Sequence, residues 1–283
     1  MNQKYNEIMG LFGVEEFKGI IKKWDVLSEN MATVMGRPKI VLPDLLWIMN
    51  SGVGRTNLLN HLAEYLYSKG NLMDFSGNVK FFEFVLNQET NVATVNEIQR
   101  FMDSVTKAAG FRNSFRGIVC VDVDEWVDSC EDKLFTSFLE LLASHSEEWM
   151  IVLSISEDKG KNCENFISHI SAYLRIETLR IEMPKAEDLL AYLKGKLALH
   201  GLSLNESACE KMKLSIEKLK SNESFDGFKS LDMLAQDIVY EHFCVQDSKK
   251  GEIPDDIIDK FDVDSKYVTR MACKQKPTIG FVG

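Results

Sequence analysis

The clearest chemical signal in this chain is an apolar, strand-like run followed by a glycine-containing turn and the start of a helix. The pattern G-x-x-x-x-G-K-[ST] of a phosphate-binding loop would place its first glycine at Met49 and its lysine at Arg55. Gly52, Gly54 and Thr56 keep residue types that such a loop uses. A loop of this kind binds phosphate through backbone N–H groups at a helix N-terminus, where the peptide dipoles add positive potential. The sequence therefore predicts a nucleotide site with two altered positions.

The two alterations have different consequences. Arg55 keeps the positive charge of the usual lysine, but its planar fork cannot act as the same compact charge between phosphates. Met49 would hinder the positive φ that a glycine permits. Thr56 could hold Mg²⁺ through its hydroxyl. The residues expected to bind the phosphates are Ser51, Gly52, Val53, Gly54, Arg55 and Thr56. The alternative is an ordinary strand–turn–helix joint whose glycines serve only the turn.

A second chemically meaningful group follows the apolar run 118–121. Acids at the end of such a strand suit a Walker-B motif, in which an Asp holds Mg²⁺ through water and a following Glu polarises the attacking water. In the first register, Asp122 is the metal-binding Asp, and Val123, which cannot accept a proton, occupies the catalytic position. In the second register, Asp124 and Glu125 form the pair and Asp122 lies deeper in the sheet. The four preceding apolar residues favour the first register and the Asp-Glu dipeptide favours the second. An acidic strand end without a role is the remaining alternative.

A parallel sheet would position both motifs, and the rest of the chain predicts one. Strands are expected at 45–49, 79–86, 118–121, 150–155 and 179–181. Helical patterns lie between them at 56–68, 95–109, 133–144 and 163–173. Because parallel neighbours need crossover connections, this alternation predicts an α/β fold with a five-stranded parallel P-loop sheet flanked by helices.

After Pro184 the pattern changes to amphipathic helices without strands between them. The candidates are 185–200, 205–220 and 228–243. A proline favours a boundary because it donates no backbone hydrogen bond and restricts the residue before it. We therefore expect a nucleotide-binding α/β domain over residues 1–183, a small all-helical lid domain over 184–245, and a C-terminal linker and tail over 246–283. The aspartate-rich segment 247–264 indicates a solvated, partly extended linker.

Composition narrows the class of protein. The 283 residues carry 33 basic and 43 acidic side chains, a formal net charge of −10, and 45% of them are hydrophobic. Such an acidic globular chain is not expected to bind nucleic acid or anionic membranes unaided. It shows neither a signal-like start nor a run of about 18 apolar residues, so no membrane span is expected. Six cysteines without a C-x-x-C pair indicate reduced thiols in a cytoplasmic protein.

The order of these motifs resembles an AAA+ module and, more narrowly, the rubisco-activase-like branch of that superfamily. Residues 13–21 are similar to the G-x-x-x-V-K-x-x-I helix that precedes the first strand. Residues 49–56 and 122–125 match the Walker-A and Walker-B positions, and 151–156 matches the fourth strand. The resemblance covers about residues 8–245, and the order of elements is more specific than any single motif.

The resemblance implies further site residues. Gly13 and Val14 would lie near the nucleotide base. Ser156 would be the polar sensor after the fourth strand, where the family more often has Asn or Thr. Lys229 would replace the common Arg of the second sensor on the lid helix. Arg175 falls where such modules carry the Arg that reaches a neighbouring subunit's nucleotide, which implies a homo-oligomer.

Departures from the family pattern at Met49, Arg55, Val123, Ser156 and Lys229 together argue against efficient hydrolysis. We therefore expect a protein that binds ATP or ADP, with Mg²⁺ where binding is retained, and acts as a regulator or assembly scaffold for an unidentified protein partner. The alternatives are an active ATPase that remodels a protein partner, a small-molecule kinase, and an interaction module with an empty site. Residues 87–97 lack the aromatic-apolar-Gly triplet of a pore loop, which argues against threading of a polypeptide.

Overall fold

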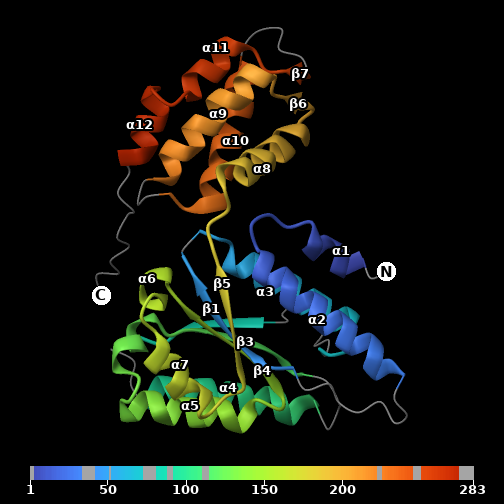
Figure 1. Ribbon diagram of the computed structural model, residues 1–283, viewed down its shortest axis with the longest axis vertical. Coiled ribbons are helices and arrows are strands. Elements are labelled where there is room, and N and C mark those ends of the chain that lie inside the picture. Colours follow the sequence, from blue (N-terminus) through green and yellow to red (C-terminus); the bar gives the residue numbers. More distant parts are fainter. Residues whose placement is uncertain are drawn as a thin grey trace. The chain divides into compact units, whose positions relative to one another are not determined.

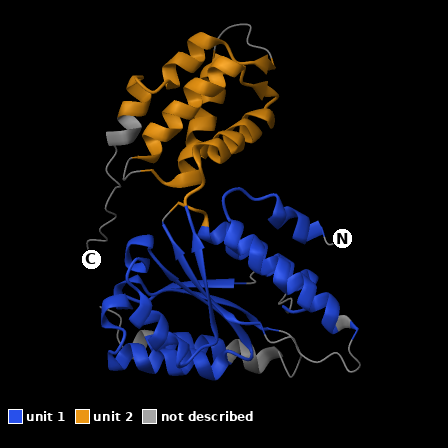
Figure 2. Cartoon of the chain, in the orientation of Figure 1, with its two compact units in different colours: residues 1–50, 55–182 blue, residues 51–54, 183–283 orange. Residues whose placement is uncertain are grey.

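The chain divides into two compact units. The computed structural model describes residues 3–33, 42–50, 52–72, 81–87, 92–109, 115–221, 225–244 and 250–273. Unit 1 consists of Met1–Asn50 and Arg55–Glu182, and unit 2 consists of Ser51–Gly54 and Met183–Gly283 (Figure 2). Apart from the short loop 51–54, the division falls next to Pro184.

Unit 1 is built on one five-stranded parallel sheet (Figure 1). Its strands are β1 (Asp44–Met49), β2 (Phe81–Val85), β3 (Gly117–Asp122), β4 (Trp149–Ile155) and β5 (Ile176–Ile181). They are arranged in the order β2-β3-β4-β1-β5, and every neighbouring pair is parallel. β1 and β4 are buried along their whole length, as strands covered on both faces should be. The predicted α/β class and five-stranded parallel sheet are confirmed.

Helices cover both faces of this sheet. The helices of unit 1 are α1 (Gln3–Met9), α2 (Glu15–Ala32), α3 (Arg55–Ser68), α4 (Val92–Ala109), α5 (Lys133–His145), α6 (Glu157–Gly160) and α7 (Glu164–Ser171), with the 3₁₀ helix η1 (Asp124–Ser129) after β3. Helices α2 and α3 lie on one face, and α4, α5 and α7 lie on the other (Figure 1). The step from β1 to β2 runs along the sheet in the direction opposite to the later steps, so right-handed crossovers place α3 on the face opposite α4 and α5.

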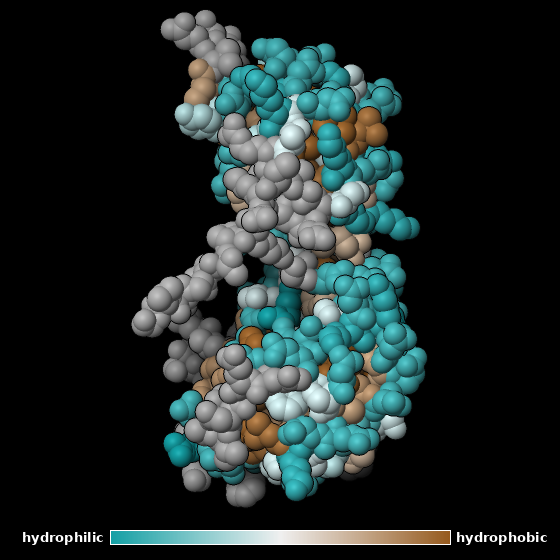
Figure 3. Space-filling model, turned by 90° about the vertical axis from the view of Figure 1, so that its left-hand side faces the viewer, coloured by the Kyte–Doolittle hydropathy of each residue, from teal (hydrophilic) through white to brown (hydrophobic). Residues whose placement is uncertain are grey.

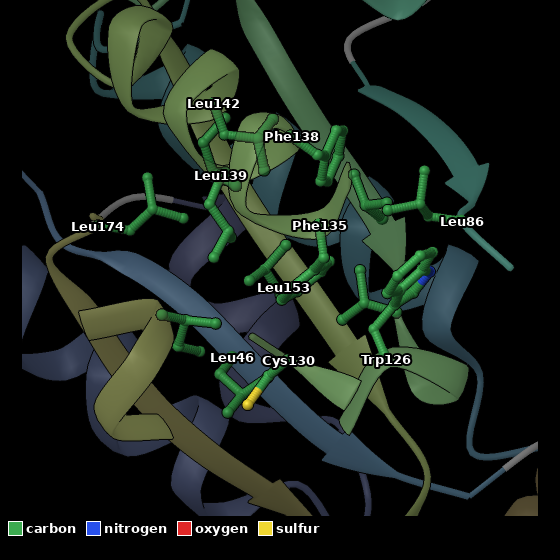
Figure 4. Close-up of a cluster of buried hydrophobic side chains, with 14 of the residues drawn as sticks. Leu46, Leu86, Trp126, Cys130, Phe135, Phe138, Leu139, Leu142, Leu153 and Leu174 are labelled. Atoms are coloured by element: carbon green, nitrogen blue, oxygen red, sulfur yellow. The ribbon is translucent and has the colours of Figure 1, made fainter. Parts of the chain in front are cut away.

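A large hydrophobic core fills the space between the sheet and helices α4, α5 and α7. Leu153 of β4 packs here with Phe135 and Phe138 of α5 (Figure 4). Trp126 of η1 stacks on Phe135 with ring centroids 5.5 Å apart. β3 and β4 pair directly beside this core, and their C-terminal ends carry the polar residues described below.

Unit 2 is a helical unit with a hydrophobic core of its own. Its elements are α8 (Ala186–Ala198), β6 (Leu202–Ser203), α9 (Glu206–Lys220), α10 (Gly227–Cys244), β7 (Gly251–Glu252), α11 (Asp255–Ile258), the 3₁₀ helix η2 (Asp259–Phe261) and α12 (Lys266–Cys273). Strands β6 and β7 form a two-residue parallel pair. The region is therefore helical as expected, with one short strand pair added.

The expectation of a solvated linker over 247–264 is wrong for the residues that the structure describes there. Ile253, Ile257, Ile258 and Phe261 are each at most 2% exposed and belong to the core of unit 2. The aspartates of α11 remain exposed, so the segment is amphipathic rather than fully solvated. Unit 2 consequently continues past residue 245 to α12.

On the face of the protein seen in Figure 3, hydrophilic residues predominate and hydrophobic residues gather only in small groups. Within the described ranges, no helix combines the length and the apolar character needed to cross a bilayer. The long apolar stretches of the sequence are instead the buried strands of the sheet.

Candidate functional site

The loop between β1 and α3 contains two glycines in a backbone conformation that glycine favours. Gly52 and Gly54 have φ values of 83° and 92°, which L side chains rarely adopt. Within the described part of the chain, the N–H groups of Val53 and Gly54 have no hydrogen-bond acceptor. Met49 ends β1 in extended conformation, so the hindrance expected from the missing first glycine does not arise. Ser51 lies outside the described residues.

Within unit 2, the same loop contacts the start of α10. The carbonyl oxygen of Gly52 accepts a hydrogen bond from the N–H of Phe228 at 3.3 Å. A Cβ on Gly227 would lie 1.9 Å from that oxygen, and a Cβ on Gly52 would lie 2.5 Å from the carbonyl carbon of Asp226. Both positions therefore require glycine. Lys229, the expected second sensor, is in the first turn of α10 with its side chain 77% exposed and 3.8 Å from the carboxylate of Asp226.

Arg55, which stands in the lysine position, is held at the C-terminal edge of the sheet by three oxygen atoms. Its Nε donates to Glu83 Oε2 at 3.2 Å, and its Nη1 donates to Asp122 Oδ2 at 2.8 Å and to Ser154 Oγ at 3.0 Å. The three partners lie on the adjacent strands β2, β3 and β4. Burial opposes the charge, yet the hydrogen bond that Arg55 donates to Asp122 and the nearby negative groups leave the pKa of Arg55 above its ordinary value.

Glu83 also binds the next residue of the motif. The hydroxyl of Thr56 donates to Glu83 Oε1 at 2.8 Å, so one carboxylate contacts both Arg55 and Thr56. Sequence reasoning missed Glu83 and Ser154. The available signals were a single acid in the β2 run Phe81–Val85 and a serine inside the apolar run of β4. Only the strand order brings them to Arg55, and that order is not a local property of the sequence.

The two acidic registers occupy distinct positions. Asp122 is the last residue of β3, and its carboxylate accepts from Arg55 and, at 3.2 Å, from the N–H of Asp124. Asp124 begins η1, and its carboxylate accepts from the N–H of Ser156 at 2.7 Å. Glu125 is exposed on η1. Among these acids, Asp122 is therefore the one that contacts the loop-side arginine.

Two buried side chains near Asp122 offer no base or nucleophile for hydrolysis. Val123 is 0% exposed and belongs to the core beneath α5. Burial raises the pKa of Cys120 to about 12, which the positive charge of Arg55 only partly offsets. The thiol therefore stays protonated at neutral pH.

Ser156 makes contacts other than those expected of a sensor. Its hydroxyl caps α6 by accepting from the N–H of Lys159 at 3.4 Å, and its N–H donates to Asp124. The serine that reaches Arg55 is Ser154, two residues earlier in β4. Ser154 is 2% exposed and lies directly opposite Asp122 in the β3–β4 register.

The other expected residues of unit 1 lie at opposite edges of the sheet. Gly13 and Val14 precede α2, and Glu16 in the first turn of that helix accepts from the N–H of Arg180 in β5 at 2.6 Å. Arg180 is near the end of β5, so Gly13 and Val14 lie toward the C-terminal edge, where Asp122 is. Arg175 precedes β5 at the N-terminal edge and is exposed.

Mg²⁺ is the ion that a nucleotide site of this kind ordinarily holds, and the donor set does not fit it. The expected donors were Thr56 and Asp122. The Thr56 hydroxyl is directed to Glu83, and an oxygen of Asp122 lies 2.8 Å from a nitrogen of the Arg55 guanidinium. Mg²⁺ requires oxygen donors in near-octahedral arrangement, and a guanidinium within hydrogen-bond distance of one donor opposes a second cation.

Comparison with solved structures supports the fold, whereas the comparisons by sequence find no match. No protein-family model and no curated protein matches the sequence. Among solved structures, PCH-2 of C. elegans is similar over 92% of this chain and 70% of its own, with a TM-score of 0.55 and 12% identity. A RuvB variant of Thermotoga maritima is similar over 86% of this chain and 68% of its own, with a TM-score of 0.51 and 13% identity. The chain has the fold of an AAA+ ATPase module. The narrower resemblance to the rubisco-activase-like branch stays a prediction.

Proposed function

We propose that this chain, which has the AAA+ fold, binds ATP or ADP, hydrolyses ATP weakly or not at all, and acts as a regulator or assembly scaffold for a protein partner. One observation carries the proposal. Arg55 is paired with two carboxylates at the sheet edge, while the loop before it keeps two glycines with positive φ. This combination supports nucleotide binding without efficient hydrolysis.

Support for binding comes from the loop and the helix that follows it. Gly54 carries no Cβ that would block approach to the backbone, and the N–H groups of Val53 and Gly54 have no acceptor in the described part of the chain. Helix α3 then runs for 14 residues from Arg55, so its dipole adds positive potential at this end. Together these features suit the terminal phosphates of a nucleotide.

Support for weak hydrolysis comes from the end of β3. The contact between Asp122 and Arg55 favours the first register, in which the catalytic position falls on the buried Val123. Valine cannot orient or deprotonate a water molecule. Loss of such an element typically slows turnover by about two orders of magnitude, or about 3 kcal/mol of barrier.

Titration with a fluorescent ADP analogue tests the binding. The unmodified chain should saturate, and Gly54→Val should abolish saturation, because a β-branched residue is strained at φ 92° and blocks the approach to the backbone. Gly195→Val is the matched control, since a Cβ at this helical position of α8 meets nothing within 4 Å. Unchanged affinity in Gly54→Val would show that the loop is not the site, and absence of saturation by the unmodified chain would contradict the proposed binding.

A homo-oligomer is the finer part of the proposal. Arg175 is exposed, and its position in the AAA+ order of elements is the one from which such modules reach a neighbour's nucleotide. Light scattering with and without ATP tests this. A nucleotide-dependent increase in mass supports the role in trans, and a monomer under both conditions removes it.

A further inference from the structure

The Arg55 guanidinium has N–H donors that its contacts at the sheet edge do not use. A guanidinium carries five N–H donors. The Nε donor is used by Glu83, and the Nη1 donors are used by Asp122 and Ser154. For Nη2, no acceptor is present among the described residues. The Arg55 side chain is 32% exposed, and Nη2 carries two N–H donors that suit the oxygens of a ligand.

The partners of Arg55 are the groups that a divalent cation would otherwise use. Asp122 closes β3 in the position of a metal-binding acid, and Glu83 adds a second carboxylate from β2. Their side chains are 29% and 26% exposed, so water screens their negative charges only in part. One guanidinium lies within hydrogen-bond distance of both and offsets part of their negative charge.

Lysine, the usual residue at this position, could not do the same. An ammonium is a compact charge that carries its three donors on one nitrogen, whereas the planar fork of arginine reaches separate acceptors with separate nitrogens. Arg55, in place of the usual lysine, and the carboxylate of Glu83 therefore belong to the same set of contacts. The arginine joins β2 to β3 and still presents a free edge.

We propose that Arg55 takes the place of the divalent cation, so that the site binds its nucleotide as a metal-free phosphate anion. This inference rests on the proposed nucleotide binding and adds which group contacts the phosphate. Nε and Nη1 donate to Glu83 and Asp122, and Nη2 donates to the phosphate oxygens. Nucleotide affinity is then independent of Mg²⁺, unlike in sites where the metal bridges the phosphates.

Titrations of the fluorescent ADP analogue in excess Mg²⁺ and in excess EDTA test the proposal. For the unmodified chain, the two dissociation constants should agree within about threefold. Arg55→Lys keeps the charge but leaves one carboxylate without its partner, so its affinity should be at least about tenfold higher with Mg²⁺ than with EDTA. Arg100→Lys, an exposed position on α4, should behave as the unmodified chain.

A second measurement needs neither nucleotide nor activity. Mn²⁺ binding, followed by the loss of the free-ion EPR signal, should increase by one site in Arg55→Met, because two carboxylates lose their guanidinium. Arg100→Met should match the unmodified chain. Any background from the partly buried cluster Glu7, His61 and Glu64, whose ligand atoms lie within 4.8 Å of one another, is common to all three proteins. Circular dichroism confirms that each variant is folded.

The outcomes separate the two proposals. Binding that requires Mg²⁺ in the unmodified chain overturns the inference and leaves the proposed nucleotide binding intact. Absence of binding with and without Mg²⁺ overturns both. A folded Arg55→Met protein that binds no more Mn²⁺ than the unmodified chain also overturns the inference, because removal of the guanidinium would then not have exposed a divalent-cation site.

Discussion

Two carboxyl groups at opposite edges of the unit 1 sheet have different surroundings. At the N-terminal edge, Asp44 is 5% exposed, and its carboxylate accepts a hydrogen bond from the N–H of Ile151 at 3.0 Å. Burial raises the pKa of Asp44 to about 7, and the Ile151 N–H lowers it only in part. At the C-terminal edge, Asp122 is half-buried and paired with the Arg55 guanidinium.

The difference lies in what offsets the negative charge of each carboxylate. Asp44 has no ion pair among the described residues, so its burial favours the protonated, neutral form of the carboxyl group. Asp122 is paired with the Arg55 guanidinium, whose side chain is 32% exposed. A perturbed pKa alone would point to the edge opposite the proposed site, since the shift at Asp44 follows from its burial.

The largest expected effect is the pH dependence due to Asp44. The pKa of Asp44 is higher in the folded chain, about 7, than its ordinary value of 3.8, so the folded state binds more protons between these values. The stability that this group contributes is therefore full at low pH and is lost as pH rises toward 7. Relative to Asp44→Asn, the wild-type free energy of unfolding should fall by up to about 4 kcal/mol over this range.

Urea unfolding of both proteins at several pH values measures this difference. Asparagine keeps an acceptor for the Ile151 N–H but does not titrate, and global acid effects are common to both chains. Parallel stability curves for the two proteins would contradict the assignment of Asp44 as a carboxyl that is neutral when folded.

The next effect concerns a carboxylate without either a proton or a cation. Val123→Glu would place an acid in the core beneath α5, one residue beyond Asp122. We expect a loss of about 3 kcal/mol or more of stability at neutral pH, because an unpaired buried charge is costly. The matched control is Val26→Glu on α2, where the valine is 57% exposed. If Val123→Glu were as stable as this control, the side chain at 123 would face solvent, and a catalytic carboxylate could be installed there.

The smallest of the three effects is the loss of the cation at the C-terminal edge. Arg55→Met leaves Glu83 and Asp122 without their partner, but both are partly solvated. We expect a cost of about 1–2 kcal/mol, below that of breaking a fully buried pair. Thermal and urea unfolding measure it, with Arg100→Met as the control. No difference between the two variants would show that the ion pair contributes nothing to the fold.

Much of the fold was predictable because its signals are local. The apolar run before the glycine turn predicted β1 within one residue, and the helical pattern after it predicted α3 equally well. The expectation of a solvated linker over 247–264 was wrong because this segment combines exposed aspartates with apolar residues at helical spacing. Ile253, Ile257 and Phe261 recur every four residues and pack into unit 2.

The site was predictable only in part because its contacts are not local. Arg55, Thr56 and Asp122 were singled out from motif spacing, and Arg55 does contact Asp122. Glu83 and Ser154 were missed, since nothing near them in the sequence shows that β2 and β4 flank β3. A motif can therefore identify the loop and the acid, whereas the second carboxylate, which decides whether a metal fits, depends on strand order.

The central claim is that the chain binds nucleotide with little or no hydrolysis, and a single-turnover phosphate-release assay with bound ATP tests it most directly. We expect ATP to bind and phosphate to appear at least about a hundredfold more slowly than the median enzyme turnover of about 10 per second. Turnover near that median, abolished by Glu125→Gln, would contradict the claim. It would establish Asp124 and Glu125 as the working pair and the protein as an active ATPase.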